Sequence, residues 1–426
     1  MSFRRRTIRT LTACAAGLAL VAPLAASQAG TATRAKPGQA RAATPVDVAP
    51  TNTIEGSNTG LADVAGLAVD AAGNRYVSNE FANTIRVFAP GATGNAAPIR
   101  TIAGAATQLS FPNGVAVDRV GFLYVSNFTS DKVTVYAPGA TGNVAPVRVI
   151  SGPSSGISDP VGNTLVGDQL VTANRNGSIT FHRRTANGNA APERSIQGAA
   201  TQLVDPYSVV LEPDGTTHVG NLNDRLLTFR PGATGNVAPT RVLDGGTLDF
   251  DRVPGLDVDS DGNLYLASGS PQPVVLVFRA GSSTPDIRLE GPLSQITQPR
   301  ELQVLSDHRL LLLNETGPAA LRTYAPLIPK TTKPGKVRAL KVAGKARAKK
   351  RKVTWKAPAS RGNSPITGYR VKVKKGGRTL LSKVVSKRSL VLKRGKLRKG
   401  KLKVIVSARN AKGFGPTVTK KFRVKK

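Results

Sequence analysis

The sequence predicts an all-β protein in two folded parts: a six-bladed β-propeller closed by an N-terminal strand, and a C-terminal β-sandwich. The first observation is a motif of the form Pro-x-Arg-x-Ile-x-Gly that recurs at steps of 46 to 48 residues, starting at Pro50, Pro98, Pro146, Pro192, Pro239 and Pro285. The second is that short β-branched runs, not helical stripes, fill each interval. The third is a last segment with the same strand patterning and a very different charge. A repeat of this length cannot bury its apolar surface alone, so it must stack on its neighbours.

Residues 1–29 have the features of a secretory signal peptide. Arg4-Arg-Arg6 is a cationic start, Leu11 to Ala26 is an apolar stretch too short to span a bilayer comfortably, and Ser27-Gln-Ala29 is a small-residue cleavage site. We therefore expect a secreted, extracellular protein or one associated with the cell wall, and we expect residues 30–49 to be flexible. Arg5-Arg6 resembles a weak twin-arginine signal, so export in the folded or the unfolded state stays open.

The cysteine content and the hydropathy of the chain exclude several kinds of site and a membrane anchor outside the leader. The single cysteine, Cys14, lies in the leader, so the mature chain has no disulfide, thiol nucleophile or cysteine-based zinc site. No other apolar run is long enough for a transmembrane segment.

Each repeat has the pattern of one propeller blade. In the second copy, residues 114–118 and 122–125 are apolar strands around a turn, residues 132–136 are a third strand, and residues 137–143 are a loop rich in turn residues. Four short strands joined by tight turns at roughly ten-residue spacing describe a blade.

The count of strands predicts how the ring closes. Residues 50–56 form a strand that precedes any blade, whereas the sixth repeat ends after its third strand at residues 321–324. Pairing the two would remove two exposed sheet edges. We therefore expect a propeller over residues 50–325, closed by residues 50–56.

The motif Gly114-Val-Ala-Val-Asp-x-x-Gly-x-Leu-Tyr-Val-Ser-Asn127 resembles NHL repeats and, more loosely, the propellers of gluconolactonase-like and streptogramin-lyase-like proteins. The resemblance implies the propeller fold. Because such propellers serve as binding scaffolds and as enzymes, it leaves the activity open.

Two sets of polar residues are candidate ligand-binding groups at the mouth of the channel. The first is a ring that follows the second strand of each repeat: Asn79, Asn127, Asn174, Asn221, Ser268 and Asn314. Such a ring could hold a divalent cation or a sugar, or each side chain could cap its own turn. The second set is Asp257 and Gln303, which replace Ala68 and Ala116 on the strand bordering the channel; the alternative is a satisfied structural pair. We predict no other cofactor.

Charge is distributed very unevenly along the chain. Of 61 Lys and Arg, 35 lie in residues 330–426, where there is no Asp or Glu, and residues 1–329 hold 26 basic and 25 acidic residues. No internal pairing can neutralise the C-terminal part, so it must attract counterions or a polyanion.

Residues 334–426 resemble a fibronectin type III domain, joined to the propeller by a stiff Pro/Lys linker at residues 326–333. Residues 334–340, 353–358 with Trp355, 366–373 and 404–416 match its first, second, third and sixth strands in order and spacing. Basic residues that alternate with apolar ones should face outward and form a cationic plate. We predict polyanion binding by Arg370, Lys372, Lys374, Lys401, Lys403, Arg409, Lys421, Arg423 and Lys425.

The sequence favours a binding and anchoring protein. The basic module would hold an anionic cell-wall polymer or polysaccharide, and the propeller would present a face to a ligand or a protein partner. The alternative is an extracellular enzyme of the lactonase or lyase type, or an accessory to polysaccharide degradation. We identify no catalytic or metal-binding residues, because His182, His218 and His308 fall at different positions of three repeats. Nucleic acid should bind only non-specifically in vitro.

Overall fold

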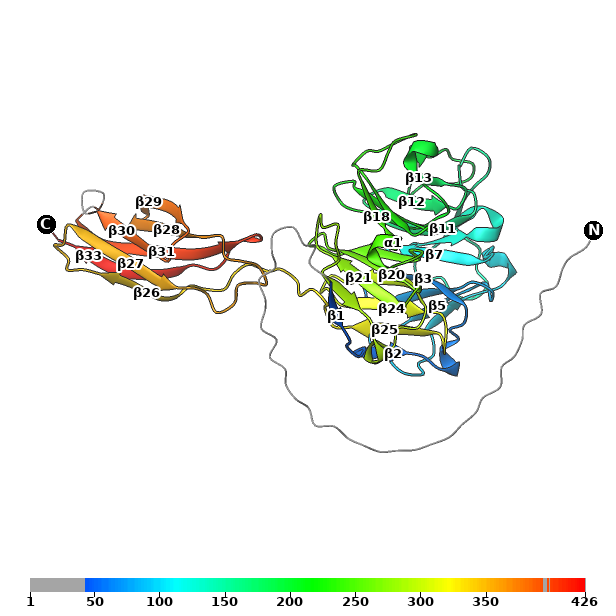
Figure 1. Cartoon of the computed structure of the whole chain (residues 1–426), viewed down its shortest axis with the longest axis horizontal. Helices are drawn as coiled ribbons and strands as arrows, with labels where there is room; N and C mark the ends of the chain where they lie inside the picture. Colours follow the sequence, from blue (N-terminus) through cyan, green and yellow to red (C-terminus); the bar gives the residue numbers. More distant parts are fainter. Residues whose placement is uncertain (1–42, 394–396, 398, 426) are drawn as a thin grey trace, which may run out of the picture. The chain divides into compact units, whose positions relative to one another are not determined.

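The structure is a computed structural model that describes residues 43–393, 397 and 399–425. The predicted signal peptide and most of the segment 30–49 lie outside these residues. The described chain is almost wholly β, with repeated four-stranded antiparallel sheets (Figure 1). No helix in the described part is long and apolar enough to cross a membrane.

The repeats fold into six sheets over residues 44–324 of the described chain, which we number in chain order. Sheet 1 contains β3 (Val64–Val69), β4 (Arg75–Asn79), β5 (Thr84–Phe88) and β6 (Arg100–Ile102). Sheet 2 contains β7 (Pro112–Val117), β8 (Leu123–Asn127), β9 (Lys132–Tyr136) and β10 (Arg148–Ser151). Sheet 3 contains β11 (Pro160–Val166), β12 (Gln169–Asn174), β13 (Ser178–Arg183) and β14 (Arg194–Gln197).

The second half follows the same order. Sheet 4 contains β15 (Pro206–Leu211), β16 (Thr217–Asn221), β17 (Arg225–Phe229) and β18 (Arg241–Asp244), followed by the short helix α1 (Gly245–Leu248). Sheet 5 contains β19 (Gly255–Val258), β20 (Leu264–Ser268), β21 (Val274–Phe278) and β22 (Ile287–Leu289). Sheet 6 contains β23 (Pro299–Val304), β24 (Leu310–Asn314) and β25 (Ala320–Tyr324).

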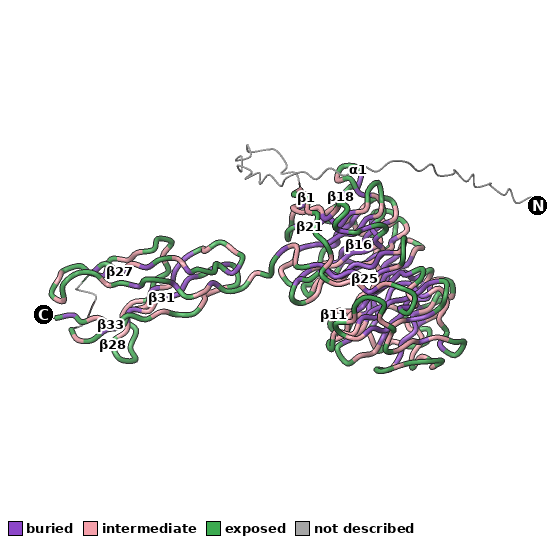
Figure 2. The backbone as a smooth tube through the Cα atoms, turned by 90° about the horizontal axis from the view of Figure 1, so that it is seen from below, coloured by how far each residue is buried: buried purple, intermediate pink, exposed green. Residues whose placement is uncertain are grey.

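The sheets stand around a common centre. Their first strands contact one another in a closed cycle, β3 to β7, β11, β15, β19, β23 and back to β3. Apolar side chains fill the space between neighbouring sheets; for example, Tyr76 and Val87 of sheet 1 pack with Val125 and Tyr136 of sheet 2. In Figure 2 the buried segments of the propeller lie in its interior, and the exposed segments are mostly in its outer loops. The repeats thus bury their apolar faces against each other, as expected of stacked units.

An N-terminal strand completes sheet 6. Strand β2 (Asn52–Ile54) pairs antiparallel with β25, with Ile54 opposite Leu321. The side chain of Ile54 is fully buried. This confirms the pairing that the strand count predicted.

The expectation that all of residues 30–49 are flexible was wrong for the described end of that segment. Strand β1 (Thr44–Val46) pairs parallel with β22, and Asp47 Oδ1 accepts a hydrogen bond from the Ser294 N–H at 2.9 Å. Equivalent backbone N–H groups of other sheets donate to the side-chain oxygens of Asn95, Asn143, Asn189 and Asn236. The loop Asp47-Val-Ala-Pro50 therefore binds sheet 5 in the same way as the Asn-x-Ala-Pro loops bind other sheets.

The C-terminal part forms two further sheets. One contains β26 (Arg338–Ala343), β27 (Lys350–Lys356) and β30 (Ser389–Lys393). The other contains β29 (Arg378–Val385), β28 (Gly368–Lys375), β31 (Gly400–Asn410), β32 (Gly413–Phe414) and β33 (Val418–Val424). Their inner faces share one core in which the rings of Trp355 and Tyr369 meet edge to face at 5.5 Å. Between the two parts, residues 325–337 contain no strand.

Candidate functional site

The centre of the propeller is a narrow channel lined by the first strand of each sheet. It encloses a cavity of about 140 Å³. Glycine permits the close approach of neighbouring strands, because a Cβ on Gly66, Gly114 or Gly162 would lie 2.2 to 2.5 Å from a backbone oxygen of the next sheet. In the sixth repeat Glu301 occupies the equivalent position, so a long carboxylic acid stands where four other repeats have glycine.

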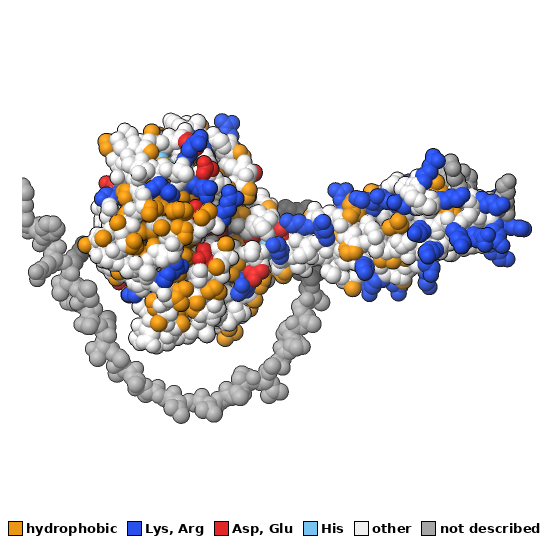
Figure 3. All heavy atoms as spheres, turned by 180° about the vertical axis from the view of Figure 1, so that it is seen from behind, with side chains coloured by type: hydrophobic (Ala, Val, Ile, Leu, Met, Phe, Trp, Pro, Cys, Tyr) orange, Lys and Arg blue, Asp and Glu red, His pale blue; other side chains and the backbone are white. Residues whose placement is uncertain are grey.

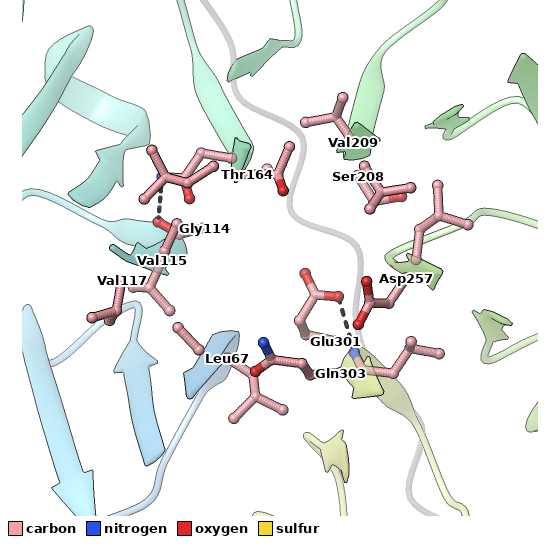
Figure 4. Close-up of a pocket in the computed structure, with 18 of the residues that line it drawn as sticks. Leu67, Gly114, Val115, Val117, Thr164, Ser208, Val209, Asp257, Glu301 and Gln303 are labelled. Carbon is pink, nitrogen blue, oxygen red and sulfur yellow. Dashed lines mark hydrogen bonds between the residues drawn. The ribbon is translucent and has the colours of Figure 1, made fainter. Parts of the chain in front are cut away.

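The acidic side chains that line this channel come from sheets 5 and 6, whereas Asn163, Thr164 and Ser208 of sheets 3 and 4 are uncharged polar residues of its lining. Asp257 and Gln303 line it, as predicted, and Glu301 joins them (Figure 4). Asp257 accepts backbone N–H bonds from Val258 at 2.8 Å and from Val304 at 2.7 Å. Glu301 accepts one from Leu302 at 2.9 Å, and the buried Gln303 Oε1 has no hydrogen-bond partner among the described residues. Their role in ligand binding stays a prediction.

Both acids in the channel are weakened by their surroundings. Burial raises the pKa of Asp257 to about 7 and that of Glu301 to about 8, because the enclosing strands exclude water from the charged forms. The charge of Asp257 raises the pKa of Glu301 further, whereas the backbone N–H donors partly offset burial at both groups.

These pKa values predict a pH-dependent stability. Both lie above the unfolded values, so the folded chain binds more protons and its stability falls as the pH rises towards 8. We expect an Asp257→Asn/Glu301→Gln variant to be more stable than the wild type at pH 9 by several kcal/mol, because each pKa unit corresponds to about 1.4 kcal/mol. Denaturant unfolding at pH 3 and pH 9 measures this; the gain should vanish at pH 3, where both acids are protonated in the folded and the unfolded chain. The exposed Asp168→Asn is the control, and an equal gain at both pH values would contradict the assignment.

The ring that follows the second strands is not open to the channel, and that expected placement was wrong. Asn79, Asn127, Asn174, Asn221, Ser268 and Asn314 are all buried, and none lines the channel cavity. Four of them accept a backbone N–H from the preceding loop at 3.0 to 3.3 Å, namely Asn79, Asn127, Asn174 and Asn314. Ser268 Oγ accepts from Asp251 N–H, and Asn221 donates to the Gln202 carbonyl. These side chains bind their own loops, which is the capping alternative.

In five of the six repeats, the residue after this side chain is the one that lines the channel mouth. Glu80, Phe128, Arg175, Leu222 and Gly269 line a pocket with a volume of about 580 Å³. These positions were not predicted from the sequence. A signal was present: in the six repeats the Asn or Ser is nearly constant, whereas the next residue differs in almost every copy.

A polar network spans this mouth between sheets that are not neighbours. Glu80 Oε1 accepts hydrogen bonds from Arg300 at 2.9 Å and from Asn113, and Asn113 Nδ2 also lies 3.2 Å from the hydroxyl of Tyr207. Burial raises the pKa of Glu80 to about 7, and the Arg300 charge opposes that rise. Tyr207 comes from sheet 4 and Asn113 from sheet 2, so the network joins two sheets that are not adjacent in the ring.

The histidines are structural in this arrangement. The His182 ring bonds the Ser155 carbonyl, His218 lies between Thr228 and Glu212, and His308 contacts Ser260. Within the described residues, no group of three or more His, Cys, Asp or Glu side chains is arranged to hold a metal ion.

The C-terminal module carries a basic face on the sheet of β28, β31 and β33. Strand alternation puts Arg370, Lys372, Lys374, Lys401, Lys403, Arg409, Lys421 and Arg423 on its outer side, with Lys425 just beyond β33. Lys374, Lys403 and Lys421 lie side by side across the three strands, and Lys401 is opposite Arg423. Like charges placed directly opposite destabilise a sheet. We call the nine residues the cationic plate; its binding role stays a prediction.

Basic residues are not confined to the cationic plate. On the other sheet Lys350 is opposite Lys393, and Lys352 and Lys356 are also exposed. Figure 3 shows Lys and Arg side chains over much of the module. This second basic surface was not predicted from the sequence.

No protein-family model and no curated protein matches the chain. Among solved structures, it is similar to the WD40 β-propeller domain of Doa1, with 10% identity over 62% of this chain and 78% of that chain and a TM-score of 0.46. It is also similar to a chain of the Mitotic Checkpoint Complex, with 13% identity over 72% of this chain and 100% of that chain and a TM-score of 0.47. The description of the fold as a β-propeller rests on the sheet topology above.

Proposed function

We propose that the chain is an exported binding protein that anchors to an anionic cell-wall polymer or polysaccharide. The proposal combines a six-bladed propeller of the NHL type, a basic module of the fibronectin type III type, and a leader at residues 1–29. The observation that carries it is the cationic plate, because rows of Lys and Arg lie side by side in a part of the chain that has no acidic residue. Such a surface is stabilised when a polyanion replaces its counterions.

The cationic plate is better suited to binding charged groups than to recognising the bases of a nucleic acid. Trp355 and Tyr369 are buried, and Phe414 lies beneath the guanidinium groups of Arg370 at 3.5 Å and Arg409 at 5.5 Å. Trp355 and Tyr369 are therefore not available for stacking, and arginine already lies over the ring of Phe414. Nucleic acid would bind by its phosphates, without sequence preference.

The test is retention of the full chain on immobilised polyanions across a salt series. We expect affinity to fall by on the order of 10³-fold or more between ~50 and ~200 mM salt, as for a protein with several phosphate contacts. Isolated cell walls, an acidic polysaccharide and duplex DNA should all show this slope. Retention that is unchanged at ~1 M salt, where the Debye length is about 3 Å, would rule out the electrostatic account.

A second candidate function, an extracellular enzyme of the lactonase or lyase type, is favoured by one observation. Asp257 and Glu301 lie in the same channel with pKa values near neutrality, as general acid–base catalysis requires. Turnover of a lactone or a polysaccharide that is lost in both Asp257→Asn and Glu301→Gln would support the enzyme and displace the binding proposal for the propeller.

A further inference from the structure

The mouth pocket of about 580 Å³ has an aromatic wall. Phe111 and Phe128 line it with their centroids 5.8 Å apart, and Phe81 meets Phe111 edge to face at 5.0 Å. Phe81 is 66% exposed, the most exposed large apolar side chain of the described residues. The cluster therefore extends from the pocket to the surface.

Phe111 holds this place at a conformational cost. Its φ of +52° lies in the left-handed region, which is unfavourable for a bulky side chain. The equivalent residues of sheets 1, 3 and 4 are Asp63, Asp159 and Asp205, with φ between 45° and 50°. Aspartate tolerates this conformation much better, so the fold itself does not call for phenylalanine here. Strain of this kind is typical of functional sites.

Guanidinium groups stand beside the aromatic wall. Arg175 lies over the ring of Phe128 at 5.5 Å, and its ion pair with Asp205 is long, at 3.7 Å. Arg252 also lines the pocket, is exposed, and has no ion pair in the part of the chain that the structure describes. The pocket thus combines aromatic rings with guanidinium groups whose charge is only partly neutralised by nearby carboxylates.

We propose that this pocket binds a uronic-acid unit of an acidic polysaccharide. The C–H face of a pyranose ring packs on an aromatic wall, because the ring's negative face attracts polarised C–H groups. A carboxylate on the same sugar forms charge-assisted, bidentate bonds with arginine. The inference rests on the proposed function, since a polyuronate is the class of polyanion that satisfies both this pocket and the cationic plate.

Other polyanions satisfy only one of the two sites. A phosphodiester wall polymer has charge for the plate but no ring that carries a carboxylate. Single-stranded nucleic acid needs aromatic rings spaced in succession, one for each base, whereas Phe81, Phe111 and Phe128 pack on one another in a single cluster. Linking a specific pocket to an electrostatic plate in one chain would raise avidity for a polymer above that of either site.

The test is calorimetric titration of the full chain with a hexamer of galacturonic acid in ~0.5 M salt, where the Debye length is about 4 Å and the plate contributes little. We expect binding that Arg175→Gln weakens about tenfold, the scale of one good charge-assisted contact. Phe128→Leu keeps an apolar side chain and should also weaken binding. The control is Arg183→Gln, the same substitution in sheet 3 on an exposed arginine that pairs with Glu193 outside the pocket.

Three results would overturn the proposal. One is no binding of the hexamer at ~0.5 M salt, and another is equal affinity in Arg175→Gln and Arg183→Gln. The third is that the methyl-esterified hexamer, or single-stranded DNA, binds as tightly as the acidic hexamer and is weakened equally by Arg175→Gln. Failure of the proposed function has a different signature, because the full chain would then not be retained by any polyanion at low salt.

Discussion

Removal of residues 44–56 should strongly destabilise the propeller. The deletion removes β1 from the edge of sheet 5 and β2 from the edge of sheet 6. It also removes Ile54 from a core shared with Leu311, Leu313 and Leu321. Burial of one such side chain contributes about 1.5–3 kcal/mol, before the lost backbone pairing is counted. We expect the thermal midpoint to fall by roughly 10 °C or more.

The deletion should also change the association state. Two sheet edges with unpaired N–H and C=O groups would be exposed, and such edges pair with other chains. Thermal melting and light scattering measure the two effects. Deleting residues 30–42 instead is the control, because those residues precede β1. A truncated chain that melts with the full-length protein and remains monomeric would show that closure does not depend on this segment.

The repeat made most of the fold predictable, because its spacing, turns and apolar alternation recur in six copies of one sequence. The pairing of β2 with β25 followed from counting strands. Strand β1 was missed because Asp47 stands where four other copies have asparagine, which hid the match between residues 47–50 and the Asn-x-Ala-Pro loops. Either residue supplies the oxygen that accepts the Ser294 N–H.

The site was harder to predict because adjacent residues at the end of a strand point in different directions. The constant Asn residues bind their own loops, and their variable neighbours line the mouth pocket. Asp257 and Gln303 were identified because they replace alanine at a recognisable position. Glu301 was not, since only the structure shows that neighbouring strands touch at the glycines that hold this position in four other repeats. The contact of Tyr207 with Asn113 joins residues far apart in sequence and no local pattern encodes it.

The module has two basic surfaces, and we expect the cationic plate to contribute much more to polyanion binding than the other. A chain with Lys372, Lys374, Lys401 and Lys403 changed to Glu should lose polyanion affinity by on the order of 10³-fold at ~50 mM salt, because each reversal replaces an attraction by a repulsion. These residues lie on one face of β28 and β31, where the register places Lys374 opposite Lys403. The substitutions leave the core of Val371, Val373, Leu402 and Val404 untouched, so the module should still fold.

The matched control changes Lys350, Lys352, Lys356 and Lys393 to Glu on the other sheet, which alters the net charge by the same amount. If the cationic plate is the binding surface, this control should weaken binding far less, through the long-range field alone. Retention on cell walls, acidic polysaccharide and DNA columns at matched ionic strength measures both variants. Equal losses would show that total charge decides binding and that the plate has no special role. Loss of one polymer with retention of the others would instead reveal a specific pocket on the module, because a purely electrostatic surface must lose all three together.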